Sequence, residues 1–465
     1  MRRQRLLILI SFSFSIRYIV RTGLLNKLKL FCDPVVGITW NEENLIEELR
    51  KDGFEVHLVP ENKRNPAYND VRKKLDIWFD RFCVKSDSRK IQQAYLDQFI
   101  SFKQKFIRNI RQWYNIAKLY IPLYRQRLFK KEEFLLRTAT NFNELTSFIN
   151  ALNIDAVFSV TPYHRQEDIL LRACKYKGKK MLTSILSFDN ITKRGWMPVE
   201  YDLYMIWNEH NKRQLNRIYP FTNNKPVYVI GAAQFDFYFK EEYLLPVDEW
   251  KKITGIPAMC SRKIILYAGG PEPLFPNEPL YLKDINEAIN KGLIKDNPLV
   301  LFRCHPIDKI DRWKEITGSS KNIVFDDSWT GKENLWYANI TVKDIKKLCS
   351  TLAYTDVHIN LCSTMTVDGS AFNKPQIGPA YVTHDIKGSN LLEKMYSQEH
   401  FVPVINTNGL HLARSAKEMI QLINQALQTP QDNNNINEAI LKNIITYSDG
   451  RTTERLASVI KDFLC

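Results

Sequence analysis

The sequence contains no pattern of residues that would hold a structural metal ion. Its eight cysteines are scattered, with no CxxC pair and no spacing typical of metal ligands. No DxD motif stands in a metal-binding context, so we expect no metal site and a metal-independent protein. In a chain of 465 residues, cysteines of this kind favour reduced, mostly buried thiols and a cytoplasmic protein.

The sequence also lacks an apolar run long enough to span a bilayer. The N-terminal run LLILISFSFSI, after the basic start RRQR, has only about half of the ~20 residues that a spanning helix needs. A signal peptide begins in a similar way, but Arg17 and Arg21 follow at once and no small-residue cleavage site is present. We therefore interpret this run as the first buried strand of an α/β domain.

Low-complexity tracts are absent, and 44% hydrophobic with 25% charged residues is ordinary globular composition. Short apolar runs alternate with helical patterns, which is typical of parallel sheets covered by helices. We expect one Rossmann-like domain in 1–245, a second in 246–440 and a C-terminal helix in 441–465. Residues 243–257 resemble an irregular linker, and two such domains would enclose a ligand cleft.

The expected strands form two series. Those of the first domain are 6–14, 34–40, 54–60, 156–160, 181–186, 202–208 and 227–232, and those of the second are 264–270, 299–305, 322–327, 357–362, 376–381 and 401–406. The last helical patterns occupy 413–427 and 436–464.

Positive charge is in excess, with a formal net charge of +15. Much of it lies in Met1–Lys29 and Arg72–Arg137, the latter within a helical insertion at about 70–140. There, basic residues alternate with Trp, Tyr, Phe and Ile, which indicates amphipathic helices. A solvated helical face and contact with an anionic membrane surface are both open interpretations. No nucleic-acid partner is expected, because no reader motif accompanies the charge.

Three strand ends of the second domain carry polar residues, and open α/β sheets bind ligands at the carboxyl ends of their strands. Gly269 and Gly270 follow the first strand, where paired glycines let a phosphate or sugar approach the backbone, although a simple turn explains them equally well. Arg303 and His305 end the next strand, before Pro306. That histidine could donate hydrogen bonds to phosphate and offset charge on a departing nucleotide, but a lone strand-end histidine is more often structural.

The third strand end runs from Asn360 into a helix. Ser363 and Thr364 fall where the helix begins, so their hydroxyls and the free N–H groups of the first turn would form an anion site. An ordinary N-cap needs no ligand. Asp368 lies about one turn further on, where it could reach a ribose hydroxyl or simply face solvent.

These motifs, followed by Lys374-Pro375, resemble the C-terminal half of GT-B glycosyltransferases that build bacterial surface polysaccharides. Similar families include capsule Kdo transferases, sialyl- and polysialyltransferases, and CDP-glycerol glycerophosphotransferases. The resemblance implies that His305, Ser363 and Thr364 bind the phosphate of a nucleotide-activated sugar donor. The donor is a substrate, so no cofactor is expected.

The middle of the chain resembles a bacterial branch of the same superfamily, whose motifs are SWDNLTSKG, VWNE and VTGAQxFD. The corresponding segments here are SFDNITKRG (187–195), IWNE (206–209) and VIGAAQFDFY (229–238), and the ending DGRTTERLA (449–457) is similar to DGRAxERxA. The resemblance covers most of the chain apart from the insertion. It implies a GT-B fold, with the donor on the second domain and the acceptor on the first.

An inverting transfer needs a carboxylate or histidine near the acceptor hydroxyl. The candidates are His164 and Glu167, which follow the strand at 156–160, and Asp189 in the SFDN turn. Sialyltransferase-like relatives carry an acidic D/E-D/E-G motif for this role, and this chain has none, so the general base stays open.

The sequence thus predicts a glycosyltransferase of surface-polysaccharide synthesis, acting on a glycan or lipid-linked acceptor. It would work in the cytoplasm, either free or on the inner face of the cell membrane. Two alternatives stay open: a UDP-sugar 2-epimerase, which shares the GT-B architecture, and a non-catalytic subunit that binds nucleotide sugars or takes part in assembly.

Overall fold

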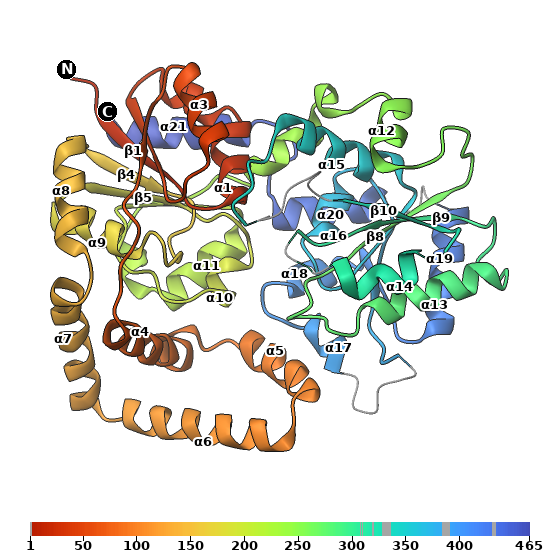
Figure 1. The fold of residues 1–465 in the computed structure, drawn as a ribbon, viewed down its shortest axis with the longest axis horizontal. Coiled ribbons are helices and arrows are strands. Elements are labelled where there is room, and N and C mark those ends of the chain that lie inside the picture. Colours follow the sequence, from red (N-terminus) through yellow and green to blue (C-terminus); the bar gives the residue numbers. More distant parts are fainter. Residues whose placement is uncertain are drawn as a thin grey trace. The chain divides into compact units, whose positions relative to one another are not determined.

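The chain folds into two compact units (Figure 1) in a computed structural model that describes residues 2–306, 308, 310–318, 320–327, 336–383, 391–429 and 434–465. Unit 1 comprises residues 1–86, 99–232 and 453–465, and unit 2 comprises residues 87–98 and 233–452. The chain therefore passes between the units four times. The sequence predicted domain limits at 245 and 440, and the last two passages lie at 232/233 and 452/453.

Unit 1 contains a seven-stranded parallel sheet in the order β3-β2-β1-β4-β5-β6-β7. Its strands are β1 (Arg5–Ile10), β2 (Asp33–Ile38), β3 (Glu55–Leu58), β4 (Ala156–Ser159), β5 (Lys180–Ser184), β6 (Leu203–Ile206) and β7 (Val227–Val229). β1 is apolar from Leu6 to Ile10, where both of its faces are buried. Leu7 and Leu9 join one core cluster, and Leu6, Ile8 and Ile10 alternate with them on the other face. The prediction of a buried first strand is confirmed for residues 6–10, but the expected strand at 6–14 was too long, because Ser13–Ile16 forms helix α1.

Helices precede and follow these strands. They are α1 (Ser13–Ile16), the π-helix η1 (Arg17–Arg21), α2 (Leu24–Leu28), α3 (Glu43–Lys51), α8 (Phe142–Leu152), α9 (Asp168–Tyr176), α10 (Asn190–Lys193), α11 (Glu209–Ile218), η4 (Pro220–Asn224) and α21 (Thr452–Leu464). Side chains of α8, α9 and α11 fill the core cluster that contains Leu7 and Leu9. At the chain ends, the side-chain amide of Gln4 donates to the Leu464 carbonyl at 2.7 Å, which ties α21 to the start of β1.

The expected helical insertion is present as α4 (Pro66–Phe79), the π-helix η2 (Asp80–Val84), α5 (Ser88–Leu96), η3 (Asp97–Phe99), α6 (Phe102–Leu119) and α7 (Pro122–Thr138). α4, α6 and α7 belong to unit 1, whereas α5 belongs to unit 2, where it packs against α17 (Leu391–Met395). Within the described residues, no helix is both long and apolar enough to cross a membrane.

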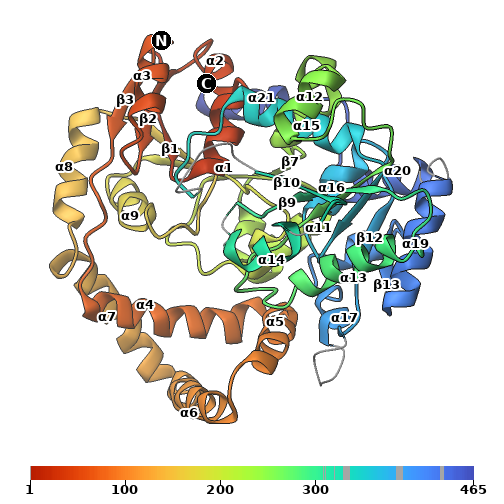
Figure 2. The ribbon, with the colours of Figure 1, turned by 45° about the vertical axis from the view of Figure 1, so that its right-hand side comes forward.

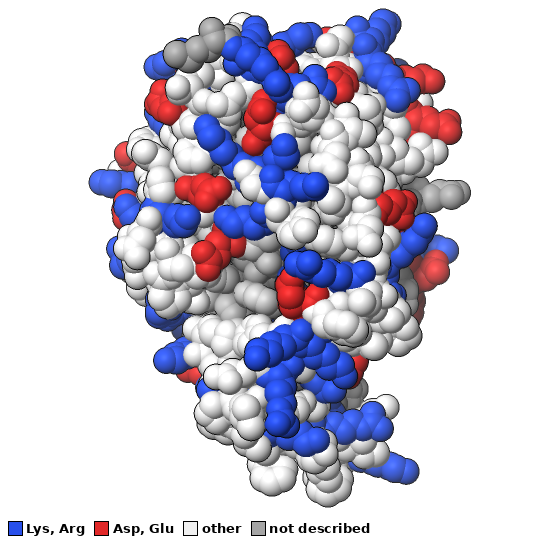
Figure 3. All heavy atoms as spheres, turned by 90° about the vertical axis from the view of Figure 1, so that its left-hand side faces the viewer, with Lys and Arg blue, Asp and Glu red and all other residues white. Residues whose placement is uncertain are grey.

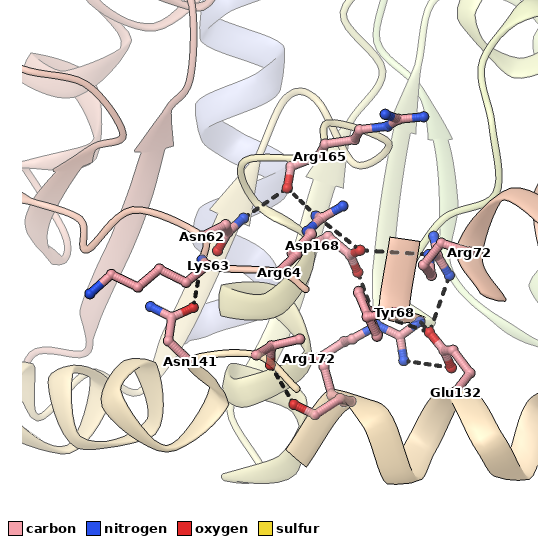
Figure 4. A network of polar contacts seen from close by, with 12 residues as sticks. Asn62, Lys63, Arg64, Tyr68, Arg72, Glu132, Asn141, Arg165, Asp168 and Arg172 are labelled. Atoms are coloured by element: carbon pink, nitrogen blue, oxygen red, sulfur yellow. Dashed lines mark hydrogen bonds and ion pairs between the residues drawn. The ribbon is translucent and has the colours of Figure 1, made fainter. Parts of the chain in front are cut away.

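A network of charged side chains joins the insertion to helix α9 of unit 1 (Figure 4). Asp168 of α9 contacts Arg64 at 3.1 Å and Arg172 at 2.9 Å, and Glu132 of α7 contacts Arg172 at 2.7 Å and Arg72 at 3.4 Å. Burial alone would raise the pKa of Asp168, but the guanidinium groups of Arg72, Arg172 and Arg64 outweigh it and hold that pKa below its usual value. The carboxylate of Asp168 is therefore ionised and fully paired.

Unit 2 contains a six-stranded parallel sheet in the order β10-β9-β8-β11-β12-β13. Its strands are β8 (Ile264–Ala268), β9 (Leu299–Arg303), β10 (Ile323–Asp326), β11 (Val357–Asn360), β12 (Gln376–Pro379) and β13 (Leu410–Ala413). Its other helices are η5 (Ala233–Phe239), η6 (Glu241–Tyr243), α12 (Val247–Thr254), α13 (Pro279–Asn290), η7 (Ile310–Trp313), α14 (Lys314–Gly318), α15 (Val342–Tyr354), α16 (Met365–Ser370), α18 (Val402–Ile405), α19 (Ala416–Gln428) and α20 (Asn434–Ile444).

These helices form two layers. α13, α14 and α19 cover one face of the sheet, and α12, α15, α16 and α20 cover the other (Figures 1 and 2). A parallel sheet with helices on both faces is the doubly wound arrangement that the alternating pattern predicted.

The prediction of a strand at 401–406 was wrong. Val402–Ile405 forms the short helix α18, and the last strand is β13, eight positions later at Leu410–Ala413. Pro403 explains the difference, because its fixed φ suits the first turn of a helix and it has no N–H for a sheet ladder.

Two further boundaries differ from expectation. The supposed linker at 243–257 contains helix α12, which ends at Gly255 in the left-handed region (φ +77°). The single helix expected at 436–464 is two helices, α20 and α21, separated by a turn in which Gly450 has φ +68°. Gly255 is a helix-ending signal that the periodicity of apolar residues does not reveal.

Candidate functional site

The strand order of unit 2 brings the three sequence motifs together. β8 is the first strand of the sheet, β9 lies on one side of it and β11 on the other, so the topology switches direction between β8 and β11. Ala268, the last residue of β8, pairs with Arg303 of β9 and with Asn360 of β11. The segments that follow these residues emerge at one carboxyl edge, at the place where open α/β sheets bind ligands.

Gly269 and Gly270 have roles in packing at this edge. The N–H of Gly269 donates to the Arg303 carbonyl at 2.9 Å, and the N–H of Gly270 donates to the Glu278 carboxylate at 2.7 Å. Neither residue has a positive φ. A Cβ at Gly270 would lie 2.6 Å from the Phe275 ring, which explains the glycine without a ligand. Both N–H groups are thus occupied, and the expected phosphate cradle at this pair gains no support.

A buried brace that the sequence did not indicate holds the glycine turn in place. Arg312 donates to the Gly270 carbonyl at 2.8 Å and to Asp308, also at 2.8 Å. Asp308 in turn accepts from the N–H of Glu272 and from the indole of Trp313. Burial raises the pKa of Glu278 to about 8, although the Gly270 N–H and Arg312 lower it. The brace links residues far apart in the sequence, so no local pattern could have predicted it.

Arg303 is paired within the protein. Its guanidinium contacts Asp326 of β10 at 2.6 Å, and Lys347 of α15 contacts the same carboxylate at 2.6 Å. All three side chains are buried. The pattern suggested that Arg303 might share a ligand-facing surface with His305, and this ion triad gives it a structural role at the end of β9.

His305 follows Arg303 and Cys304 at the rim. Burial lowers the pKa of His305 to about 4. The negative charge of Asp308 opposes this shift only in part, and the positive charge of Arg312 adds to it. The imidazole is therefore neutral at pH 7. In this state it can donate one hydrogen bond to a phosphate oxygen, but it carries no positive charge until an anion raises its pKa.

Ser363 and Thr364 precede helix α16, as the sequence predicted. The Ser363 hydroxyl accepts from the N–H of Met365 at 3.3 Å, and Thr364 is exposed at the N-cap without a side-chain cap bond. Cys362 has φ +43°, a left-handed conformation that turns the chain from β11 into the helix. The hydroxyls thus lie at the carboxyl edge beside the end of β8.

Asp368 is buried inside α16 and accepts a hydrogen bond from the Tyr238 hydroxyl. The Asp368 side chain is therefore bonded within the protein, so the interpretation that it simply faces solvent was wrong. Lys374, in the KP pair, is half-buried, and burial lowers its pKa. Pro375 leads into β12, where its carbonyl accepts from the N–H of His358 at 2.9 Å.

The sheet of unit 1 switches direction between β1 and β4, and a hydroxyl cluster lies at that edge. Ser11, Ser159 and Thr161 all donate to the carboxylate of Glu167, which is 0% exposed. Burial raises the pKa of Glu167 to about 7, and the three hydroxyls only partly oppose it. Glu167 is sealed from solvent, which weighs against it as the general base.

His164 lies beside this cluster and stacks on Phe12, with ring centroids 5.5 Å apart and planes at 5°. Burial, together with the nearby charges of Arg194 and Arg64, lowers the pKa of His164 to about 4. The buried Nδ1 atom has no hydrogen-bond partner among the described residues. The imidazole is neutral at pH 7 and could accept a proton.

Asp189 and the motifs around it are tied to one another. Asp189 contacts Lys193 at 3.4 Å and accepts from the Asn190 amide at 3.0 Å. The Asn211 amide donates to the Phe188 carbonyl at 2.9 Å, joining the turn after β5 to helix α11. In unit 2, the Asp236 carboxylate accepts from the N–H of Thr452 at 2.9 Å. The SFDN motif thus ties the turn after β5 to helix α11, and the QFDFY motif ties η5 to the start of α21.

Metal ligands were not expected from the sequence. Among the described residues, no group of three or more His, Cys, Asp and Glu side chains could hold a metal ion.

Two Rossmann-like parallel-sheet units in one chain define the GT-B class of fold, as predicted. No protein-family model and no curated protein sequence matches the chain. Solved structures do match. A glycosyltransferase from Rickettsia africae aligns with a TM-score of 0.52 and 13% identity, over 100% of this chain and 99% of that one.

UDP-GlcNAc 2-epimerases are similar to the same degree. The enzyme from Methanocaldococcus jannaschii aligns with a TM-score of 0.54 and 11% identity, over 98% of this chain and 99% of that one. The enzyme from Neisseria meningitidis, bound to UDP-GlcNAc, aligns with a TM-score of 0.53 and 11% identity, over 98% and 100%. At such identities the likeness concerns the fold, and function must be argued from the site.

Proposed function

We propose that this protein is a glycosyltransferase that moves a sugar or related group from a nucleotide-activated donor to a glycan or lipid-linked acceptor, in surface-polysaccharide synthesis. The observation that carries the proposal is the meeting of the His305 and Ser363 motifs at the switch point of the unit 2 sheet, on either side of β8. The printed activities of the similar folds, a glycosyltransferase and enzymes acting on UDP-GlcNAc, agree with a nucleotide-sugar substrate.

The donor's phosphates would bind at the carboxyl edge of unit 2. The neutral imidazole of His305 would donate one hydrogen bond, and the hydroxyls of Ser363 and Thr364 would donate others. An anion held there would raise the pKa of His305, so that a protonated imidazole could stabilise the departing nucleotide. Gly269 and Gly270 would shape this edge through packing, and Arg303 would support it through its ion pair with Asp326.

The acceptor would bind at the carboxyl edge of unit 1. His164 is the favoured proton acceptor there, because its Nδ1 atom has no hydrogen-bond partner among the described residues and Glu167 is sealed. Asp189 is the second candidate. No metal or cofactor is assigned to the reaction. The protein would act on the cytoplasmic side of the cell membrane, where nucleotide-activated donors are available.

Thermal stability in the presence of nucleotides tests the donor site. CMP, CDP, UDP, GDP and their sugar conjugates would be screened, because a ligand at 100 times its Kd stabilises the folded state by about 2.7 kcal/mol. We expect one nucleotide to raise the midpoint selectively, and the His305→Ala and Ser363→Ala variants to lose the shift. His57→Ala, in β3 of unit 1, is the matched control. No shift with any nucleotide at several millimolar would refute the donor site.

Product analysis separates the remaining alternatives. A 2-epimerase, favoured by the similar epimerase folds, would convert a UDP-sugar with no acceptor present. A non-catalytic binding subunit, favoured by the sealing of Glu167, would bind a nucleotide and turn over no donor with any acceptor. A transferase would form product only when the acceptor is added.

A further inference from the structure

Helix α6 has an apolar face that lies in solvent. Phe102, Phe106, Ile110 and Trp113, called here the α6 stripe, recur every three or four residues and therefore lie along one side of the helix. Their side chains are 82%, 55%, 51% and 72% exposed. A stripe of this kind in a globular protein normally packs into a core, so its exposure calls for a partner.

The helix itself is well defined at both ends. At its start the Ser101 hydroxyl accepts from the N–H of Gln104 at 3.3 Å, and the Gln104 side chain accepts from the N–H of Ser101 at 3.1 Å. This reciprocal capping box fixes the first turn. At the other end Leu119 is buried against Leu75 of α4 and Leu128 of α7. The α6 stripe lies in the turns before this anchored end.

Charge along the segment that contains the α6 stripe is of one sign. No acidic residue occurs in 98–131, whereas basic residues occur throughout that segment at Lys103, Lys105, Arg108, Arg111, Lys118, Arg125, Arg127, Lys130 and Lys131. Tyr120, Ile121 and Leu123 are exposed at the turn between α6 and α7. In Figure 3, Lys and Arg gather over the lower part of the face shown, where this segment lies, and acidic atoms are sparse there.

Two kinds of occupant fit this surface poorly. A second copy meeting it through the same face would bring two acid-free cationic segments together, and like charges would repel. A nucleic acid would satisfy the cations and could stack on aromatic rings, but it would leave Ile107, Ile110 and Ile121 without an apolar environment.

An anionic membrane surface satisfies both features at once. Apolar side chains enter the boundary between headgroups and acyl chains, basic side chains pair with lipid phosphates, and Trp and Tyr rings favour that depth. We infer that α6 and the α6–α7 turn dock this protein on an anionic membrane, with the α6 stripe inserted at the headgroup boundary. This inference goes beyond the proposed transfer reaction and does not depend on it.

Vesicle binding tests the inference with the full-length protein and no nucleotide. We expect it to sediment with phosphatidylcholine vesicles that contain about a quarter of phosphatidylglycerol, to remain in solution with pure phosphatidylcholine, and to dissociate as salt rises. Phe102→Ser with Trp113→Ser should weaken binding roughly tenfold or more, since two large side chains leave the interface. Leu30→Ser with Met259→Ser is the matched control, because those side chains are 80% and 94% exposed elsewhere.

Charge reversal provides a second variant. Lys103→Glu with Arg111→Glu should also weaken binding roughly tenfold, whereas the exposed control Lys291→Glu with Lys314→Glu should leave it within about twofold. All variants replace exposed side chains, so an unchanged thermal midpoint establishes that each one is folded.

Several results would overturn the inference. These are no sedimentation with anionic vesicles at low salt, equal loss in the control pairs, or self-association that the Phe102/Trp113 variant abolishes. Tight binding of single-stranded RNA that displaces the protein from vesicles would assign the surface to nucleic acid. Failure here would leave nucleotide stabilisation of the donor site intact, and failure of that site would leave vesicle binding intact.

Discussion

The carboxyl edges of the two sheets are built from different chemistry. At the edge of unit 2, buried ion pairs stabilise the end of β9, because the carboxylate of Asp326 contacts both Arg303 and Lys347. At the edge of unit 1, the carboxylate of Glu167 receives three hydroxyl donors. The charges of unit 1 are gathered one residue later, at Asp168, among three guanidinium groups.

The difference shows how burial and pairing compete. Hydroxyl donors stabilise a carboxylate only in part, so burial prevails and the pKa of Glu167 rises to about 7. Guanidinium groups reverse the outcome at Asp168, whose pKa stays below its usual value. The two edges therefore stabilise their buried carboxylates in different ways, with paired cations in unit 2 and with hydroxyl donors in unit 1.

The largest expected effect comes from breaking the ion triad of unit 2. Asp326→Asn leaves Arg303 and Lys347 buried without their shared carboxylate and should lower the free energy of unfolding by about 3–5 kcal/mol. Urea denaturation followed by circular dichroism measures it. Asp311→Asn is the control, because its pair with Lys314 is exposed to solvent and should contribute little to stability. Equal losses in the two variants would mean that the triad is not a buried support.

A smaller effect on stability is expected from the titration of Glu167 at the edge of unit 1. The folded pKa of Glu167, about 7, lies above its unfolded value of 4.5, so its contribution is fully present below pH 4.5 and is lost as pH rises through 7. The protein should therefore lose about 2–3 kcal/mol of stability between pH 5 and pH 8 from this group. Glu167→Gln should remove that slope.

Urea denaturation at pH 5, 6.5 and 8 measures the slope. Glu133→Gln is the matched control, because Glu133 is half exposed in α7 and pairs with Arg137 on the surface. If Glu167→Gln kept the slope of the unmodified protein, the hydroxyl cluster would hold an ionised carboxylate, and the contrast with the ion triad would disappear.

The smallest effect concerns packing at the glycine turn of unit 2. Gly270→Ala places a Cβ 2.6 Å from Phe275 and should lower the unfolding free energy by about 1–2 kcal/mol. Gly318→Ala, where no atom lies within 4 Å, should be neutral or slightly stabilising. The thermal shift caused by the nucleotide is measured on Gly270→Ala as well. An unchanged shift supports packing as the role of Gly270, whereas a selective loss of the shift would indicate that Gly270 belongs to the phosphate site.

Much of the fold followed from the sequence, because apolar strands and helical patterns are local signals. The first half of the run after RRQR could be assigned to a buried strand, and Ser363 could be placed at a helix start. The strand predicted at 401–406 was wrong, because a short apolar segment fits a strand or a helix equally well. The position of Pro403 favoured the helix.

The candidate site was less predictable. The sequence placed three polar motifs at strand ends of the second domain, and the strand order of unit 2 brought Ala268, Arg303 and Asn360 together. The partners of polar side chains could not be anticipated, because Glu278 meets Arg312 and Tyr238 meets Asp368 across long stretches of chain. Such pairs decide whether a polar side chain is available to a ligand or is bonded within the protein.

The return of α21 to unit 1 has a consequence for biosynthesis. Its apolar residues Leu456, Ile460 and Leu464 are buried, yet a ribosome makes them only after residues 233–452. At about 5–20 residues per second, the sheet of unit 1 waits roughly 10–45 s for its last helix. During that interval the surface that α21 will cover is open to chaperones, and a message that stops short of this helix would yield an aggregation-prone chain.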